Sequence, residues 1–105
     1  MNHLQELSSI ELIQYLQEKE SVALFVYTPM CGTCKLAARM LGIMQEALPA
    51  VPLYQININT APALAEQWQV TSVPALLIFQ RNELVARHYA IQSVGFLYDV
   101  LKPLA

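Results

Sequence analysis

The chain has 105 residues, of which 55% are hydrophobic and 13% are charged, and its formal net charge is −2. This size and composition predict one globular domain over residues 1–105 and exclude an intrinsically disordered chain. The scattered charges exclude the basic surface of a nucleic-acid-binding protein, and the longest apolar runs, of six and seven residues, are too short to cross a membrane.

The N-terminal stretch MNHLQELSS has neither a basic start nor an apolar run before a small-residue cleavage site. It therefore shows no secretory signal, and we expect a cytoplasmic location. The two cysteines of the chain, Cys31 and Cys34, are separated by only two residues. In a reducing compartment such a pair is more often reactive than structural.

The first predicted helix begins after Ser8. Ser8 and Glu11 have the spacing of a capping box, which marks a helix N-terminus. The apolar residues spaced by three along this helix, expected to form its buried face, are Ile10, Ile13 and Leu16. Before the helix, residues Met1–Gln5 are a candidate for a short first strand.

A strand, a helix and a second strand are predicted next. The continuously apolar run Val22–Tyr27 is typical of a strand buried on both faces. Thr33–Leu48 is rich in good helix formers and is followed by Pro49, which ends the helix. Its apolar stripe comprises Leu36, Met40, Ile43 and Ala47. The β-branched segment Leu53–Ile58 then predicts a strand and completes a βαβ unit.

Two more helices are expected in the C-terminal half. A short one begins near Pro62, capped by Asn59 or Thr60, and closes near Trp68. The last runs from Ser93 to Leu101, with one apolar side made of Val94, Leu97, Tyr98 and Leu101.

Between these helices lie the two halves of a hairpin. Ala75–Gln80 and Leu84–Tyr89 read as strands that flank the short polar connection 81–83, and they predict an antiparallel pair. Alternating strands and helices followed by a hairpin indicate an α/β fold with a mixed sheet and helices on both faces.

Cys31 and Cys34 lie where the first predicted strand meets the second predicted helix. Cys31 is thereby expected at the helix N-cap, where free backbone N–H groups and the helix dipole favour a thiolate. A thiol with a pKa of about 8.5 is only about 3% ionised at pH 7, whereas a pKa of about 7 makes half of it nucleophilic. Cys34, one turn into the helix, is expected to keep a higher pKa and to resolve a mixed disulfide.

Three segments together resemble the thioredoxin superfamily over nearly the whole chain: VALFVY leading into CGTCK, Asn57-Ile58-Asn59, and the run from Thr71 to Phe79 that contains Val73-Pro74. The resemblance implies a thioredoxin-like α/β fold with a central mixed sheet of four to five strands. It also implies a thiol-disulfide oxidoreductase without a cofactor that acts on protein disulfides. A reductase or a low-molecular-weight thiol would supply its electrons.

The resemblance also implies where substrates bind. Pro74 stands at the place of the family's cis-proline opposite the dithiol, and the Val73 backbone would pair with an extended substrate strand. Gly32 would let a partner's backbone come close to Cys31. With Met30 as an exposed apolar contact and Thr33 inside the motif, these five residues are the predicted substrate-binding set.

The sequence departs from the family at positions around the motif. Phe25 stands where classical members keep a buried aspartate, and Gln55 stands where they have its lysine partner. We therefore expect Cys34 to lack an internal base and resolution to be slow. Thr33 replaces a proline, so its N–H is available to the Cys31 thiolate, and we expect a less reducing couple.

Other interpretations of the cysteines stay open at this point. One is a buried structural pair of thiols. Another is a zinc site, which normally needs four ligands, and the candidate ligands His3 and His88 lie far from the motif in sequence. A peptide-binding adaptor with little redox turnover is the main alternative function, and Phe25 favours it. Lys35 and Arg39 are interpreted as a solvated helix face, with Lys35 adding positive potential near Cys31.

Overall fold

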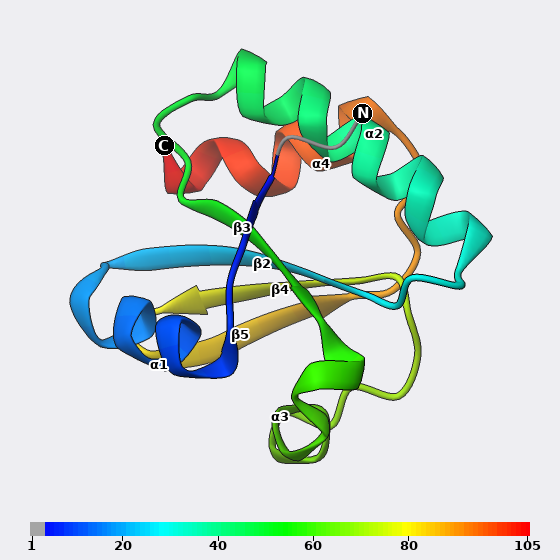
Figure 1. The fold of residues 1–105 in the computed structure, drawn as a ribbon. Coiled ribbons are helices and arrows are strands. Elements are labelled where there is room, and N and C mark those ends of the chain that lie inside the picture. The colour runs from blue at the N-terminus through cyan, green and yellow to red at the C-terminus, as the bar shows by residue number, and fades with distance from the viewer. Residues whose placement is uncertain (1–3) are drawn as a thin grey trace.

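A computed structural model describes residues 4–105 of the chain. Strands and helices alternate through β3, and the hairpin β4–β5 precedes the last helix (Figure 1). In chain order the elements are β1 (Gln5–Glu6), α1 (Ser9–Glu18), β2 (Ser21–Tyr27), α2 (Gly32–Ala47), β3 (Leu53–Asn57), η1 (Ile58–Thr60), α3 (Pro62–Gln67), β4 (Ala75–Gln80), β5 (Glu83–His88), α4 (Val94–Leu101) and η2 (Lys102–Leu104).

The five strands form one mixed sheet in the order β1-β3-β2-β4-β5. β1, β3 and β2 run parallel, β4 is antiparallel to β2, and β5 is antiparallel to β4. The predicted α/β fold with a mixed sheet of four to five strands is therefore confirmed. The short first strand consists of Gln5 and Glu6, and the part of that prediction on residues 1–3 lies outside the described residues.

Helices cover both faces of the sheet. Figure 1 shows α2 and α4 together on one face, and α1 and α3 toward the other. Alternate residues of β2 serve the two resulting core clusters, because successive side chains of a strand point to opposite faces. Phe25 packs in the cluster under α2 and α4, whereas Leu24 and Val26 pack in the cluster under α1 and α3. Among residues 4–105, no helix is long and apolar enough to span a bilayer.

The predicted start of α1 is confirmed, but its predicted buried face is wrong. Ser8 caps the helix, and its side chain and that of Glu11 form the expected capping box. Leu12 and Leu16 are buried, whereas Ile10 and Ile13 are exposed. The chain enters α1 directly from β1, and this path orients the helix so that the Leu12 side meets the sheet.

The apolar stripe predicted for α2 is also on the wrong side. Leu36 and Ile43 are more than half exposed, at 55% and 52%, and Met40 is only partly buried. The residues that pack against the sheet are Cys34, Ala37, Ala38, Leu41 and Met44. The small side chains of Ala37 and Ala38 let this face of the helix approach the strands closely. This face is buried, although the exposed face with Leu36 and Ile43 is also apolar.

The β4–β5 hairpin is confirmed, with a tighter loop than expected. Only Arg81 and Asn82 connect the strands, and both have positive φ angles, of 50° and 65°. Two consecutive positive φ values are the mark of a type I′ turn, which asparagine tolerates better than most residues do. β5 therefore begins and ends one residue earlier than predicted.

The smaller elements differ from prediction mainly at their caps. Asn57, and neither Asn59 nor Thr60, provides a cap, and it caps η1 rather than α3. Ile58 lies in this turn, so β3 is one residue shorter than predicted, and α3 has no side-chain cap. The last helix was predicted from Ser93 to Leu101 and is α4. Ser93 caps α4. Of the predicted apolar side, Leu97 and Leu101 are buried and Val94 is partly buried, whereas Tyr98 is exposed.

Candidate functional site

The two cysteines lie at the junction of β2 and α2, as the sequence predicts. β2 has five consecutive buried residues and is bordered by β3 and β4, so the strand end that leads to the motif is held in place. After Tyr27 the chain turns, and the Cys31 N–H donates to the Thr28 carbonyl at 3.3 Å. Cys31 is the N-cap residue of α2, and both thiols are free.

The Cys31 sulfur has two close hydrogen-bond partners. The Cys34 N–H donates to Cys31 Sγ at 3.2 Å, and the Thr33 hydroxyl lies 3.3 Å from the same sulfur. The pKa of the Cys31 thiol is lowered, chiefly by the hydrogen bond with the Cys34 side chain and then by that with Thr33. The Thr33 N–H expected from the sequence is a minor cause of this lowered pKa, and the Thr33 hydroxyl, which the sequence reasoning overlooked, is a larger one.

Cys34 is in the opposite situation, because only 3% of its surface is exposed. Burial raises the pKa of its thiol to about 11, and the hydrogen bond with Cys31 adds to this rise. Near neutral pH Cys34 is therefore protonated, while Cys31 is the more acidic of the two thiols. Lys35 is not among the causes of the lowered Cys31 pKa.

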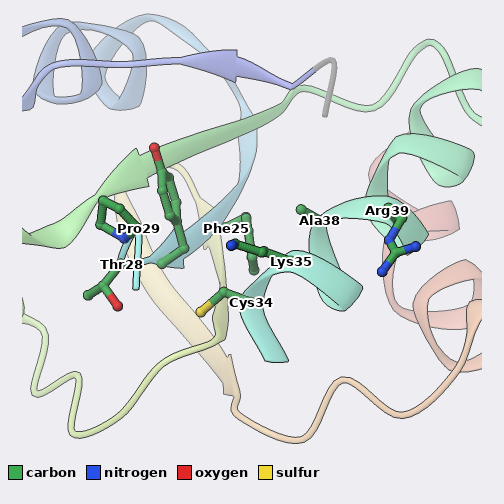
Figure 2. Close-up of a pocket in the computed structure, with 8 residues that line it drawn as sticks. Phe25, Thr28, Pro29, Cys34, Lys35, Ala38 and Arg39 are labelled. Atoms are coloured by element: carbon green, nitrogen blue, oxygen red, sulfur yellow. The ribbon is translucent and has the colours of Figure 1, made fainter. Parts of the chain in front are cut away.

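A pocket of about 490 Å³ lies beside Cys34, and we call it the Cys34 pocket. Figure 2 shows Thr28 and Pro29 on one side of it and the α2 residues Lys35, Ala38 and Arg39 on the other. The lining residues are Phe25, Tyr27, Thr28, Pro29, Cys34, Lys35, Ala38 and Arg39. No carboxylate is among these eight, so no acid faces Cys34 from the walls of this pocket.

Phe25 and Gln55 are direct neighbours on β2 and β3, where the resemblance placed an acid and its lysine partner. The Phe25 ring is buried and stacks on Tyr27, with ring centroids 5.8 Å apart. The Gln55 amide donates to Glu6 Oε1 at 2.9 Å. Gln55 is therefore paired with an acid on β1 instead of one on β2.

Glu6 was not singled out from the sequence, although it organises this edge of the sheet. Besides Gln55, the Tyr27 hydroxyl donates to its Oε1 at 2.7 Å and the Asn57 N–H donates to its Oε2 at 3.1 Å. Burial, and then the hydrogen bond and charge of Glu6, raise the pKa of Tyr27 to about 12. No local sequence pattern reveals Glu6, because its partners are 21 to 51 residues away.

Val73 and Pro74 lie on the segment that leads into β4, and the peptide bond between them is cis, as the resemblance implies. Pro74 and Thr33 line a common pocket of about 370 Å³, which we call the Pro74 pocket. Its other walls come from α2 and from the loop after β5, namely Leu36, Ala37, Met40, Tyr89, Ala90, Ile91 and Gln92. The structure thus brings the cysteine motif and Pro74 together. Leu36 and Met40, which were predicted to lie on the buried face of the helix, instead line this pocket.

The remaining predicted substrate contacts are both on the surface. Met30 is 95% exposed immediately before Cys31. Gly32 is the first residue of α2, and a Cβ at this position would have no atom within 4 Å. The chain's own packing therefore does not require glycine there, and a role in admitting a partner's backbone stays a prediction.

Metal ligands do not gather around the motif in the part of the chain that is described. Within residues 4–105, no three or more His, Cys, Asp or Glu side chains are grouped as a metal site would need. His88 packs edge-to-face on Phe96, with ring centroids 5.4 Å apart. His3, the other histidine considered, lies outside the described residues.

Comparisons with known proteins agree with this geometry. Residues 4–100 match the family described as Thioredoxin. The chain is 45% identical over 85 residues to a thioredoxin-like protein, YusE, from Bacillus subtilis, covering 81% of this chain and 80% of that one. It is 30% identical over 75 residues to a thioredoxin of Chlamydia trachomatis, covering 71% and 74% of the two chains.

Solved structures support the fold. A mutant thioredoxin from Halobacterium salinarum superposes with a TM-score of 0.84 at 23% identity, covering 95% of this chain and 88% of that one. Mitochondrial thioredoxin 3 from Saccharomyces cerevisiae gives 0.84 at 20% identity, covering 96% and 95%. With its paired cysteines at the start of α2, this chain belongs to the thioredoxin family, whose chemistry is thiol-disulfide oxidoreduction.

Proposed function

We propose that this protein exchanges disulfides with protein substrates through Cys31 and Cys34, with Cys31 as the nucleophile. The observation that carries the proposal is the unequal environment of the two thiols. The partly exposed N-cap thiol has a lowered pKa, and its partner one turn away is buried with a raised pKa. A thiolate that is both available and hydrogen-bonded is what attack on a disulfide requires.

The reaction proceeds in two exchanges. The Cys31 thiolate attacks one sulfur of the substrate disulfide, so that a mixed disulfide forms and the other substrate sulfur leaves as a thiolate. Cys34 then loses its proton and attacks the Cys31 sulfur, which releases the second substrate thiolate and leaves a Cys31–Cys34 disulfide. A thiol reductase or a low-molecular-weight thiol returns two electrons. In the cytoplasm, where thiols are kept reduced, the dithiol would begin each cycle reduced.

Substrate binding is assigned to the surface around Cys31. Met30 and Gly32 leave the nucleophile open, and Thr33 and Pro74 line the Pro74 pocket beside it. The Val73 backbone would pair with an extended segment of the substrate, in the manner of an added strand. An apolar side chain of that segment would then enter the Pro74 pocket, whose nine lining residues are all uncharged.

A peptide-binding adaptor with little redox turnover is the second candidate function. The raised Cys34 pKa and the buried Phe25 favour it, because both slow the second exchange. In either case Cys31 forms the first covalent contact, so trapping and turnover have to be measured separately.

The test combines a trapping variant with its matched control. We expect Cys34→Ser to accumulate mixed disulfides with protein substrates on a non-reducing gel, and Cys31→Ser to accumulate none. Wild type should reduce a model protein disulfide through repeated turnovers, and Cys31→Ser should lose at least about 10³-fold of that rate, because the attacking thiolate is absent. If Cys34→Ser traps nothing beyond the control and wild type fails to turn over, the oxidoreductase proposal is wrong. Trapping without turnover would support the adaptor.

A further inference from the structure

The proposed mechanism leaves the Cys34 pocket without a role. α2 separates it from the Pro74 pocket, since the two pockets are lined by different residues of this helix. Cys31 does not line it, so a substrate joined to Cys31 does not have to fill it. Its volume of about 490 Å³ lies within the roughly 300–1,000 Å³ typical of small-molecule sites.

The charged residues that line the Cys34 pocket are all positive. Lys35 and Arg39 are one helical turn apart, and both line the opening. None of the eight lining residues is acidic. Glu6 accepts a hydrogen bond from the Tyr27 hydroxyl and its charge acts on that group, but Glu6 does not line the pocket. The pocket therefore presents two cations to whatever enters it.

The walls of the pocket are mainly apolar. Tyr27 and Phe25 stack with an interplanar angle of 13°, and Pro29 and Ala38 complete two further sides. Tyr27 is neutral across the physiological range, as its pKa is raised to about 12. Flat apolar walls next to two cations suit a ligand with a flat apolar body and one anionic group.

We propose that the Cys34 pocket binds a small aromatic carboxylate, with its ring between the Tyr27 side and Ala38 and its carboxylate near Lys35 and Arg39. Binding itself does not depend on the proposed function. The consequence for catalysis does depend on it, because a ligand there covers Cys34 and slows the second exchange, while Cys31, which does not line the pocket, stays reactive.

Binding is tested on the reduced full-length protein with 2-naphthoate, and with 2-naphthamide as the neutral analogue of the same shape. Calorimetric or NMR titration should show saturable binding, with the carboxylate several-fold tighter than the amide. Chemical-shift changes should be centred on Lys35, Ala38 and Tyr27.

Charge variants then test the two cations. Lys35→Gln and Arg39→Gln should each weaken 2-naphthoate binding about twofold to fivefold, as expected for exposed ion pairs, and leave 2-naphthamide binding unchanged. The double variant should remove the preference for the carboxylate. Arg81→Gln, on the β4–β5 turn, is the matched control and should bind like wild type. All three positions are exposed, so these variants are expected to fold.

Three results would overturn the proposal: equal affinity for the acid and the amide, shift changes centred elsewhere, or no saturable binding. A kinetic readout separates it from the proposed function. Saturating 2-naphthoate should slow release of a mixed disulfide without changing the rate at which iodoacetamide alkylates Cys31. If the ligand binds but the protein lacks oxidoreductase activity, the site stands and only the catalytic consequence is lost.

Discussion

The two cysteines are the same residue type three positions apart, yet their surroundings are opposite. Cys31 lies at the open N-cap of α2 and receives hydrogen bonds that favour its thiolate. Cys34 lies inside the first turn, on the helix face that packs on Phe25 and the sheet, and burial raises its pKa to about 11. One helical turn is enough to give the two thiols different roles, because Cys31 lies at the open end of the helix whereas Cys34, three residues further in, packs against the core.

The same division continues along the outer surface of α2. Leu36 and Met40 form the apolar wall of the Pro74 pocket, whereas Lys35 and Arg39 form the charged rim of the Cys34 pocket. Positions 35 and 36 are adjacent in sequence but point to different sides, since each residue turns the helix by about 100°. The helix thus offers an apolar surface beside the nucleophile and a cationic one beside the resolving thiol.

Removing the ring that covers Cys34 should have the largest effect. Phe25→Ala leaves a cavity in the core, and we expect it to lower the free energy of unfolding by about 3–5 kcal/mol. It should also increase alkylation of Cys34, because water and reagents then reach the thiol. Urea denaturation measures the first effect and mass spectrometry of the alkylated protein measures the second.

Phe79→Ala is the matched control, because Phe79 is equally buried but packs in the other core cluster. It should cost a similar amount of stability without a comparable gain in Cys34 alkylation. Equal reactivity of Cys34 in both variants would mean that general loosening, and not Phe25, exposes the thiol.

The pH dependence of alkylation compares the two thiols directly. Thiolate increases with pH. In Cys34→Ser, where a serine hydroxyl can take the place of the Cys34 thiol as hydrogen-bond partner, the Cys31 rate should reach half its maximum below the ordinary pKa of a cysteine. The Cys34 rate in Cys31→Ser should still be rising near pH 11. At pH 7 the difference in rate should be at least about a hundredfold, from ionisation alone. Coincident pH profiles would contradict the assignment of attacking and resolving roles.

Thr33 has a smaller expected effect, on the stability of the Cys31 thiolate and so on the reduction potential. Thr33→Val removes the hydroxyl near the Cys31 sulfur, and Thr33→Pro also removes the N–H. Both changes destabilise the thiolate, so the reduction potential should fall, by about 10–30 mV, with proline at least as low as valine. Equilibration with glutathione buffers measures this potential. A Thr33→Pro potential equal to or above that of wild type would refute the explanation.

Glu6→Gln should have the smallest effect, and it tests the edge of the sheet behind the Cys34 pocket. Without the carboxylate, the Tyr27 pKa should fall from about 12 but stay above its ordinary value, because burial is the larger cause of the rise. An NMR titration of the tyrosine rings measures this pKa, and Tyr27→Phe identifies the signal. An unchanged Tyr27 titration would show that Glu6 does not set its environment.

Much of this protein follows from local sequence. The Ser8–Glu11 capping box, the buried run of β2 and the position of Cys31 at the start of α2 depend on neighbours within a few residues, and all three were predictable. The cis bond before Pro74 was predictable only through family resemblance, because X-Pro bonds alone favour trans.

Tertiary structure decided which faces are buried and which distant residues meet. Both apolar stripes on α2 satisfy the helical period, and only the path of the chain from β2 brings the Ala37 and Ala38 side onto the sheet and leaves Leu36 exposed. Glu6 meets Gln55 and Tyr27 because β1, β3 and β2 lie side by side. Periodicity specifies the spacing of side chains around one element, but the packing of elements selects the side that is buried.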